Sequence, residues 1–321
     1  MTLSPLTMAI AGLRAFRKLR SSGFDPDVID AYYLYPDCVA ATIVGQVIGK
    51  PMVHTAFGSD VSQIPEYILP KRMILWAINL SYATTAVCNA LKAGLERLGA
   101  DGKKINVIEH GVDLDLFHPL ERHAAGRVGT GQNNPVVLSV GHLIERKGHD
   151  LAIRAIAEVP EAQLLIIGSG PEEGKLKALI TELGLEERVR LLGQLPQQSL
   201  PRFFSTADVF LLCSHREGIA NVILESLACG TPVAATDVWG SSEVLTTPDA
   251  GALIFERTPQ AVADTIRKLI YSPPAGENTR HVAERYSWQS TARQHFSVLQ
   301  KSVRQHAKKN GRATGYVSNG L

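Results

Sequence analysis

Two glutamates enclose a short apolar stretch in the second half of the chain, in the sequence EGIANVILE (217–225). The surrounding residues predict a strand, a loop and a helix, with Glu217 in the loop and Glu225 about one turn inside the helix. The first N–H groups of a helix have no partner within it, so a helix start attracts anions. Carboxylates accept hydrogen bonds from hydroxyls, which sugars present in pairs. The stretch therefore predicts a binding site for a phosphate that is flanked by two sets of hydroxyl groups, as in a nucleotide-sugar.

Two cations, Arg146 and Lys147, lie in the sequence VLSVGHLIERKGHDLAIRAI (137–156). A strand is expected to end at Gly141, which puts both cations in a loop facing the same crevice. There they could neutralise a diphosphate leaving group without a metal. Each feature has an ordinary explanation, because charged turns are usually solvated and a first-turn acid is favoured by the helix dipole. Their combination favours the nucleotide-sugar site.

The elements that would position these residues alternate regularly. Short apolar runs rich in β-branched residues are separated by helical patterns, which is typical of parallel α/β architecture. The pattern restarts after the polar stretch 121–135, the best candidate for a linker. We expect a shortened amino-terminal domain over 1–125 and a donor-binding domain over 126–285. A carboxyl-terminal helix over 286–308 would return to the first domain, followed by a disordered tail over 309–321.

Composition narrows the choice of partners and location. The 33 basic and 31 acidic residues leave no general positive surface, so we expect no nucleic-acid partner. The four scattered cysteines and the histidines show no metal-ligand spacing, and free thiols are typical of a cytoplasmic protein. The basic stretch RAFRKLR (14–20) predicts either a solvated helix face or a peripheral contact with the inner face of the cell membrane.

With these residues in view, the chain resembles the retaining GT-B glycosyltransferases of family 4, from about residue 24 to about residue 295. HGVDLDLFHP resembles the inter-domain motif, VGHLIERKGHDLAIRA the donor-phosphate loop, and EGIANVILESLACGTPVAAT the E-x7-E donor motif. FDPDVIDAYYLYPDCVAATIVGQVIGKPMVHTAFGSDV resembles members that build bacterial surface polysaccharides, including teichuronic-acid-type enzymes. The resemblance implies two Rossmann-like parallel-sheet domains facing a cleft, the amino-terminal one incomplete.

The resemblance also implies roles by position. Arg146 and Lys147 would hold the diphosphate and Glu217 the donor sugar, and these three would carry the catalysis. Glu225 would meet the ribose. The remaining donor contacts would come from Gly141, from Gln194 and Leu195 near the base, and from the helix start at Gly218, Ile219, Ala220, Asn221 and Val222. On the acceptor side lie His54, Gly58 and Asp60.

The implied reaction moves a hexose-type sugar from a nucleotide-diphosphate sugar to a polysaccharide or lipid-linked acceptor. The anomeric configuration is retained, and neither a metal nor another cofactor is expected. The departing phosphate would take the acceptor's proton, which explains why no nucleophile–base pair is found.

The chain departs from the family at three places. His142 and Phe57 stand where many members carry arginine and histidine, and only about two dozen residues precede the first matching strand. This predicts that the first half of the amino-terminal sheet, with its glycine-rich loop, is missing. A nucleotide-sugar-binding module or an inactive fragment is therefore the alternative.

The glycine-rich LLIIGSGPEEG (164–174) does not have dinucleotide spacing, which disfavours an NAD enzyme, and a sugar epimerase would lack the E-x7-E context.

Overall fold

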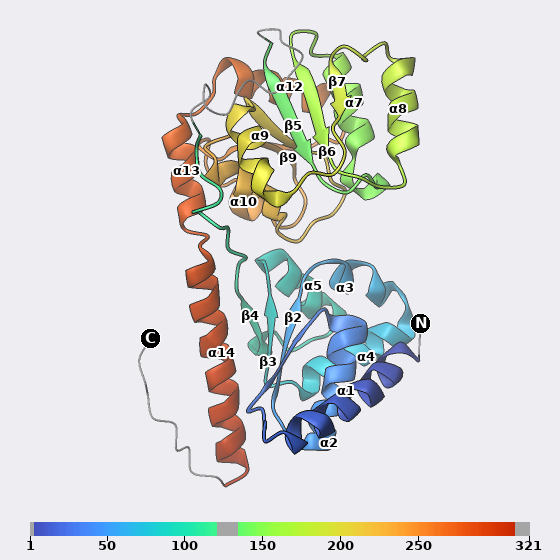
Figure 1. The fold of residues 1–321 in the computed structure, drawn as a ribbon, viewed down its shortest axis with the longest axis vertical. Coiled ribbons are helices and arrows are strands. Elements are labelled where there is room, and N and C mark those ends of the chain that lie inside the picture. Colours follow the sequence, from blue (N-terminus) through green and yellow to red (C-terminus); the bar gives the residue numbers. More distant parts are fainter. Residues whose placement is uncertain (1–2, 121–133, 312–321) are drawn as a thin grey trace. The chain divides into compact units, whose positions relative to one another are not determined.

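The computed structural model describes residues 3–120 and 134–311 (Figure 1). In both stretches buried parallel strands alternate with helices, as the apolar runs of the sequence predict. Among these described residues, no helix is both long enough and apolar enough to span a membrane.

Contacts divide the chain into two compact units. The first contains Met1–Glu109 and Thr291–Leu321, and the second contains His110–Ser290. The boundary between the units therefore falls before the predicted division at residues 125 and 126. The predicted linker and the predicted disordered tail lie mostly outside the described residues.

The first unit is built on a parallel sheet of four strands in the order β1-β2-β3-β4 (Figure 1). The strands are β1 (Ile29–Tyr32), β2 (Met52–Ala56), β3 (Ala83–Ala86) and β4 (Ile105–Val107). The helices are α1 (Ser4–Ser21), α2 (Val39–Ile48), α3 (Ser59–Ser62), α4 (Ile68–Leu80), α5 (Asn89–Leu98) and α14 (Trp288–Lys309), with short turns η1 (Leu34–Cys38), η2 (Ile64–Glu66) and η3 (Gly102–Lys104).

Helices cover both faces of this sheet. Side chains alternate between the faces along a strand, and β2 is buried at every position. Val53 packs with Val298 of α14, whereas the imidazole of His54 lies 3.2 Å from the hydroxyl of Thr42 in α2. The carboxyl-terminal helix thus covers one face of the first sheet and α2 the other.

The second unit is built on a parallel sheet of six strands in the order β10-β9-β8-β5-β6-β7. The strands are β5 (Val136–Val140), β6 (Gln163–Ile167), β7 (Val189–Leu191), β8 (Val209–Leu212), β9 (Val233–Thr236) and β10 (Gly251–Ile254). The helices are α7 (His149–Ala157), α8 (Glu173–Glu182), α9 (Leu200–Thr206), α10 (Asn221–Ala228), α11 (Ser241–Val244), α12 (Pro259–Tyr271) and α13 (Gly276–Glu284), with turns η4 (Glu145–Lys147) and η5 (Gln197–Ser199).

The core of the second unit has two layers because its strands are buried on both faces. Val209 and Leu211 of β8 join a large apolar cluster with residues of α7, α8 and α12. Phe210 points the other way, and its ring lies 5.4 Å from that of Phe204 in α9. Strand β10 was not predicted, because its GALI sequence begins with two residues that rarely favour strands.

The return of α14 to the first unit can be tested with two substitutions on that helix. Val298→Asp is expected to lower the free energy of unfolding by about 2–4 kcal/mol, because it buries a carboxylate against Val53 and Ala83. Phe296, which is half exposed, is the matched control, and Phe296→Asp should change it by less than about 1 kcal/mol. Urea denaturation measures both, and equal effects would contradict the packing.

Candidate active site

Two neighbouring loops bring the predicted charged residues together. Strands β5 and β8 pair directly in the sheet, and parallel strands end at the same edge. The loop after β5 contains Arg146 and Lys147 in the turn η4. The loop after β8 contains Glu217. Sheet topology therefore places three side chains at one point although 70 positions separate Lys147 and Glu217.

The carboxylate of Glu217 is surrounded by donors. Lys147 Nζ lies 2.5 Å from Oε1, and the Ser214 hydroxyl donates to the same oxygen at 2.9 Å. Arg146 Nη1 lies 3.6 Å from Oε2. The Lys147 and Glu217 side chains are only 15% and 10% exposed, so water screens this pair weakly. The arrangement is a partly buried carboxylate flanked by two cations.

Backbone contacts fix the two loops against each other. The amide of His215 donates to the carbonyl of Arg146 at 2.8 Å, and Arg146 Nη1 donates to the carbonyl of Arg216 at 2.9 Å. Gly148 has a φ of 67°, and a Cβ there would overlap the carbonyl oxygen of Cys213. Only glycine combines this left-handed conformation with so close an approach.

Arg257, which precedes α12, joins the site from a third loop. Its Nη2 donates to the carbonyl of Cys213 at 3.0 Å, and its Nη1 lies 2.9 Å from His215 Nδ1. Sequence reasoning missed Arg257 and Ser214. Ser214 is three residues from Glu217, but nothing in the local pattern around Arg257 indicates that it reaches this loop.

The first residues of α10 follow the Glu217 loop directly and form the next part of the site. The helix begins at Asn221 after the extended residue Ala220, and no side chain caps it. Gly240 donates its amide to the carbonyl of Gly218 at 3.0 Å, and a Cβ at Gly240 would overlap that oxygen. Asn221 Oδ1 lies 2.9 Å from His110 Nδ1. The side chains of Ile219 and Val222 are apolar, and they are buried and half-buried respectively. Polar contacts from these two residues must therefore come from their backbone groups.

Glu225 is buried four residues into α10, at 8% exposure. Burial raises the pKa of its carboxyl to about 7, and a hydrogen bond from the Gln197 side chain opposes this rise. The carboxyl therefore changes its charge near neutral pH. The two glutamates of the E-x7-E motif thus differ, since Glu217 is paired with cations and Glu225 is desolvated.

A small pocket of about 190 Å³ lies beside Gly141 at the same edge. Its wall includes Gln194 and Leu195 from the segment after β7, as well as Ser169. His142 Nδ1 lies 2.5 Å from the carbonyl of Ser169. The imidazole is therefore turned toward the β6 loop and not toward Lys147.

The acceptor-side candidates lie in the first unit, after β2. His54 is fully buried, and burial lowers its pKa to about 4. Asp60 is also fully buried, and its carboxylate accepts hydrogen bonds from the amides of Phe57, Gly58 and Leu34. Burial raises the pKa of Asp60, whereas these amides lower it. Asp60 therefore shapes the loop around Gly58, whereas the side chain of His54 is directed at Thr42 of α2.

Among residues 3–120 and 134–311, no three His, Cys, Asp or Glu side chains are grouped so that they could hold a metal ion.

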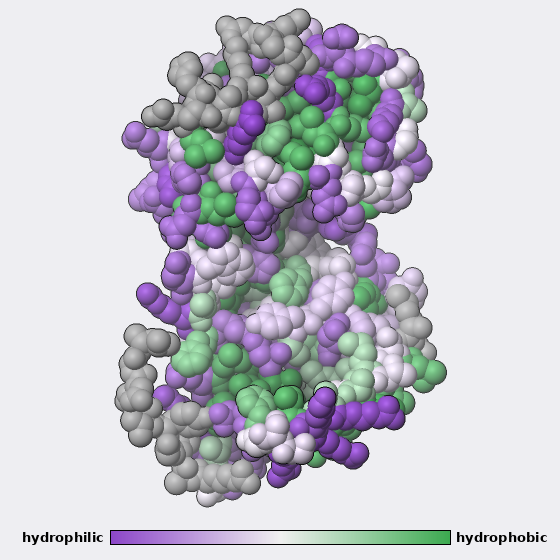
Figure 2. All heavy atoms as spheres, in the orientation of Figure 1, coloured by the Kyte–Doolittle hydropathy of each residue, from purple (hydrophilic) through white to green (hydrophobic). Residues whose placement is uncertain are grey.

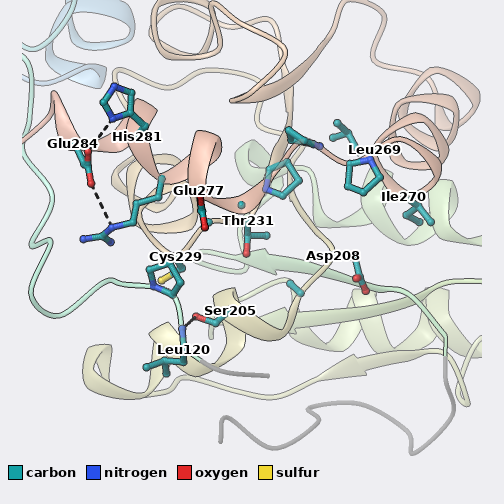
Figure 3. Close-up of a pocket in the computed structure, with 18 residues that line it drawn as sticks. Leu120, Ser205, Asp208, Cys229, Thr231, Leu269, Ile270, Glu277, His281 and Glu284 are labelled. Carbon is teal, nitrogen blue, oxygen red and sulfur yellow. Dashed lines mark hydrogen bonds and ion pairs between the residues drawn. The ribbon is translucent and has the colours of Figure 1, made fainter. Parts of the chain in front are cut away.

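A second pocket, of about 760 Å³, lies at the opposite, amino-terminal ends of β8 and β9 (Figure 3). Its wall includes Thr231, Glu277 and Arg280, and Arg280 donates to the carbonyls of Phe117 and Ala228. None of the predicted site residues lines it.

Comparison with known proteins matches both parts of the chain to glycosyltransferase families. Residues 125–290 match Glycosyl transferases group 1, and residues 2–116 match Glycosyltransferase Family 4. D-inositol 3-phosphate glycosyltransferase of Mycobacteroides abscessus is 31% identical over 228 residues, which are 68% of this chain and 51% of that protein. The chain thus spans about half the length of this relative.

Solved structures show the same architecture. Sucrose-phosphate synthase from Thermosynechococcus elongatus superposes with a TM-score of 0.79 and 23% identity, covering 91% of this chain and 77% of that one. Anabaena Alr3699/HepE in complex with UDP and glucose superposes with a TM-score of 0.74 and 22% identity, covering 92% and 81%. The predicted α/β fold with two parallel-sheet domains of the GT-B type is confirmed.

The burial of Glu225 predicts a pH-dependent stability. Its pKa of about 7 lies above the ordinary 4.5, so the folded protein binds a proton that the unfolded chain releases. Stability should therefore fall as pH rises from about 4.5 to 7. Glu225→Gln, which resembles the protonated form, should raise the free energy of unfolding by about 1–3 kcal/mol near pH 8 and change it little near pH 4.

Urea denaturation at both pH values measures this difference. The exposed Glu182 of α8 provides the control, since Glu182→Gln should have little effect at either pH. A Glu225→Gln protein that is less stable near pH 8 would show that the carboxylate is stabilised in the fold.

Proposed function

Because the chain belongs to the group 1 glycosyltransferases, we propose that it transfers a sugar from a nucleotide-diphosphate sugar to a carbohydrate or lipid-linked acceptor, with retention of the anomeric configuration. One observation carries this proposal: Lys147 and Arg146 converge on Glu217 beside an uncapped helix start. Cations suit a diphosphate, and a carboxylate beside them suits sugar hydroxyls.

The diphosphate is proposed to lie against Arg146 and Lys147, with the amides from Ile219 to Val222 as further donors. Helix starts and lysine side chains both favour negative charge at this position. Glu217 is then left to accept hydrogen bonds from the donor sugar. Its rigid setting, held by Ser214 and Lys147, would orient the sugar for reaction.

The ribose and the base of the nucleoside are proposed to bind at two neighbouring places beyond the diphosphate. Glu225 would accept hydrogen bonds from the ribose hydroxyls, which favour its ionised form. The base would enter the pocket beside Gly141 and meet backbone groups of Gln194 and Leu195. The pocket of about 190 Å³ matches the size of a flat heterocycle better than that of a whole nucleotide.

In the proposed reaction the bond between the anomeric carbon and the diphosphate oxygen breaks as the acceptor oxygen forms the glycosidic bond on the same face. The acceptor hydroxyl passes its proton to the departing phosphate oxygen. Lys147 and Arg146 stabilise the negative charge that develops on the diphosphate. We propose that this chain needs neither a metal nor a cofactor for this step.

The acceptor is proposed to approach the loop from Phe57 to Asp60 in the first unit. Asp60 would hold Gly58 in place through the hydrogen bond that it accepts from the Gly58 amide, and His54 stays the least supported of the three acceptor-side candidates because its imidazole lies against Thr42. We propose a growing surface polysaccharide, of the kind made by teichuronic-acid-type enzymes, or its lipid-linked precursor as acceptor. The protein would work in the cytoplasm, in peripheral contact with the inner face of the cell membrane.

A second candidate function follows from the first sheet. Strand β1 stands at its edge, with β2 as its one partner among the described strands. If the loops that complete the acceptor side are lacking, the second unit would bind nucleotide-sugars without transferring them. Binding without hydrolysis or transfer, in the presence of acceptor extracts, would favour this binding module.

Calorimetric titration with UDP, UDP-glucose and GDP-mannose tests the roles of the two charges. Lys147→Ala should weaken the binding of the nucleoside diphosphate itself by about ten-fold or more, because a charge-assisted hydrogen bond of about 1.5–3 kcal/mol is lost. Glu217→Ala should not weaken diphosphate binding, since it removes a competing anion. It should instead lower donor hydrolysis and the extra affinity that the sugar contributes.

Lys177 serves as the matched control, because it pairs with Glu173 at 2.7 Å on the exposed side of α8. Lys177→Ala should leave binding and hydrolysis as in the wild type. If the Lys147 and the Glu217 variants both bind and hydrolyse the nucleotide-sugar like the wild type, the proposed function is overturned.

A further inference from the structure

Arg257 lies in the short connection between β10 and α12, and the elements on both sides anchor its backbone. Strand β10 pairs with β9, and Thr258, the next residue, caps α12 by accepting a hydrogen bond from the Ala261 amide at 3.2 Å. Charged side chains mostly stand at the surface, as the hydrophilic side chains along the outline of the second unit show (Figure 2). Arg257 is instead half-buried.

The guanidinium of Arg257 reaches a loop that belongs to a more distant strand. Strand β9 lies between β10 and β8, so those two strands are about 10 Å apart. Nη2 donates to the carbonyl of Cys213 at 3.0 Å, and Nη1 lies 2.9 Å from His215 Nδ1. Because Nη1 is a donor, Nδ1 is the acceptor, which requires a neutral His215 with its proton on Nε2. The long side chain and planar fork of arginine allow both contacts at once.

These two contacts lie on either side of Ser214 in the sequence. The Ser214 hydroxyl donates to Oε1 of Glu217 at 2.9 Å, so Arg257 fixes the chain around a residue that holds the carboxylate. Nη2 also lies against the neighbouring loop, because a Cβ added to Gly148 would be 3.1 Å from it. Gly148 directly follows Lys147. One side chain therefore meets both of the loops that bring Lys147 and Glu217 together.

We propose that Arg257 is a positioning residue of the donor site, which holds Glu217 where it meets the donor sugar. The inference rests on the proposed function, in which Lys147 and Arg146 bind the diphosphate and Glu217 accepts hydrogen bonds from the sugar. Because the contacts of Arg257 go to the Glu217 loop, its effect reaches the sugar through Glu217. A displacement of about 1 Å in such a group can cost about a hundred-fold in rate.

The contact with His215 gives the proposal a titratable reporter. Desolvation and then the charge of Arg257 lower the pKa of His215; Asp150 and Glu145 raise it, and Arg216 lowers it. At neutral pH the imidazole is therefore uncharged and accepts the hydrogen bond. Protonation would place a second cation 2.9 Å from Nη1, so acid breaks this contact.

Calorimetric titration separates the effect on the sugar from the effect on the diphosphate. Arg257→Gln should leave the affinities for UDP and GDP within two-fold of the wild type, which also shows that the variant is folded. The ratio of the affinities for UDP-glucose and UDP, or for GDP-mannose and GDP, should fall at least five-fold. Hydrolysis of the donor should fall equally. Arg257→Lys keeps the charge without the fork, and should still lose at least three-fold in both.

Combination with Glu217→Ala shows whether Arg257 acts through that carboxylate. In the Glu217→Ala protein, Arg257→Gln should lower the affinity ratio by less than a further two-fold, because the group that it positions is gone. Losses that multiply in the double variant would overturn the proposal, and so would a weaker UDP affinity with an unchanged ratio. Arg267, which pairs with Asp264 at 3.1 Å on α12, is the matched control, and Arg267→Gln should behave like the wild type.

His215 supplies a test that does not depend on donor binding. In a nuclear magnetic resonance titration its imidazole should take up a proton below the ordinary pKa of 6.5, and Arg257→Gln should raise the midpoint. An unmoved midpoint would overturn the proposal. A raised midpoint in a chain that binds neither UDP nor GDP would count against the nucleotide-sugar site, while still supporting the placement of the Glu217 loop by Arg257.

Substitution of His215 itself separates positioning from a general loss of structure. His215→Asn keeps an acceptor close to the Nδ1 position but cannot be protonated, whereas His215→Phe has no acceptor. The asparagine variant should therefore hydrolyse the donor at least five-fold faster than the phenylalanine variant. Its activity should also decline less than that of the wild type as the pH falls below 6.5. Equal activities of the two variants would contradict the role of this contact.

Discussion

The contact between Lys147 and Glu217 is the constraint on which the site depends. It joins the loops after β5 and β8, which pair in the sheet, and both side chains are largely withdrawn from water. A carboxylate in such a place needs its cation, because a buried charge without a partner is strongly disfavoured. The pair therefore holds the two loops in one arrangement, and Arg146 beside it gives the group of three side chains a net positive charge where the proposed diphosphate would bind.

The parts around this pair are mostly backbone. Gly148 lets the first loop approach the carbonyl of Cys213, and Arg257 donates a hydrogen bond to the same carbonyl. Gly240 supports Gly218 in the same way, through its amide. Rigid loops at the carboxyl ends of parallel strands are the usual setting for ligands in open α/β sheets.

Under the proposed function, the two units would divide the chemistry between them. The second carries the charged site and has a complete two-layer core. The first has a smaller sheet and a loop shaped by the buried Asp60. A donor site on one unit and an acceptor loop on the other are what the proposed function requires.

Local patterns in the sequence determined most of the elements. Short apolar runs predict the strands from β1 to β9, and the spacing of Glu217 and Glu225 around a helix start predicts a site for sugar hydroxyls. What the tertiary structure alone decided are the contacts between distant residues. Arg257 reaches Cys213 across 44 positions, and Lys147 reaches Glu217 across 70 positions. Local sequence cannot determine these features, because they arise only when strands far apart in the chain become neighbours in the sheet.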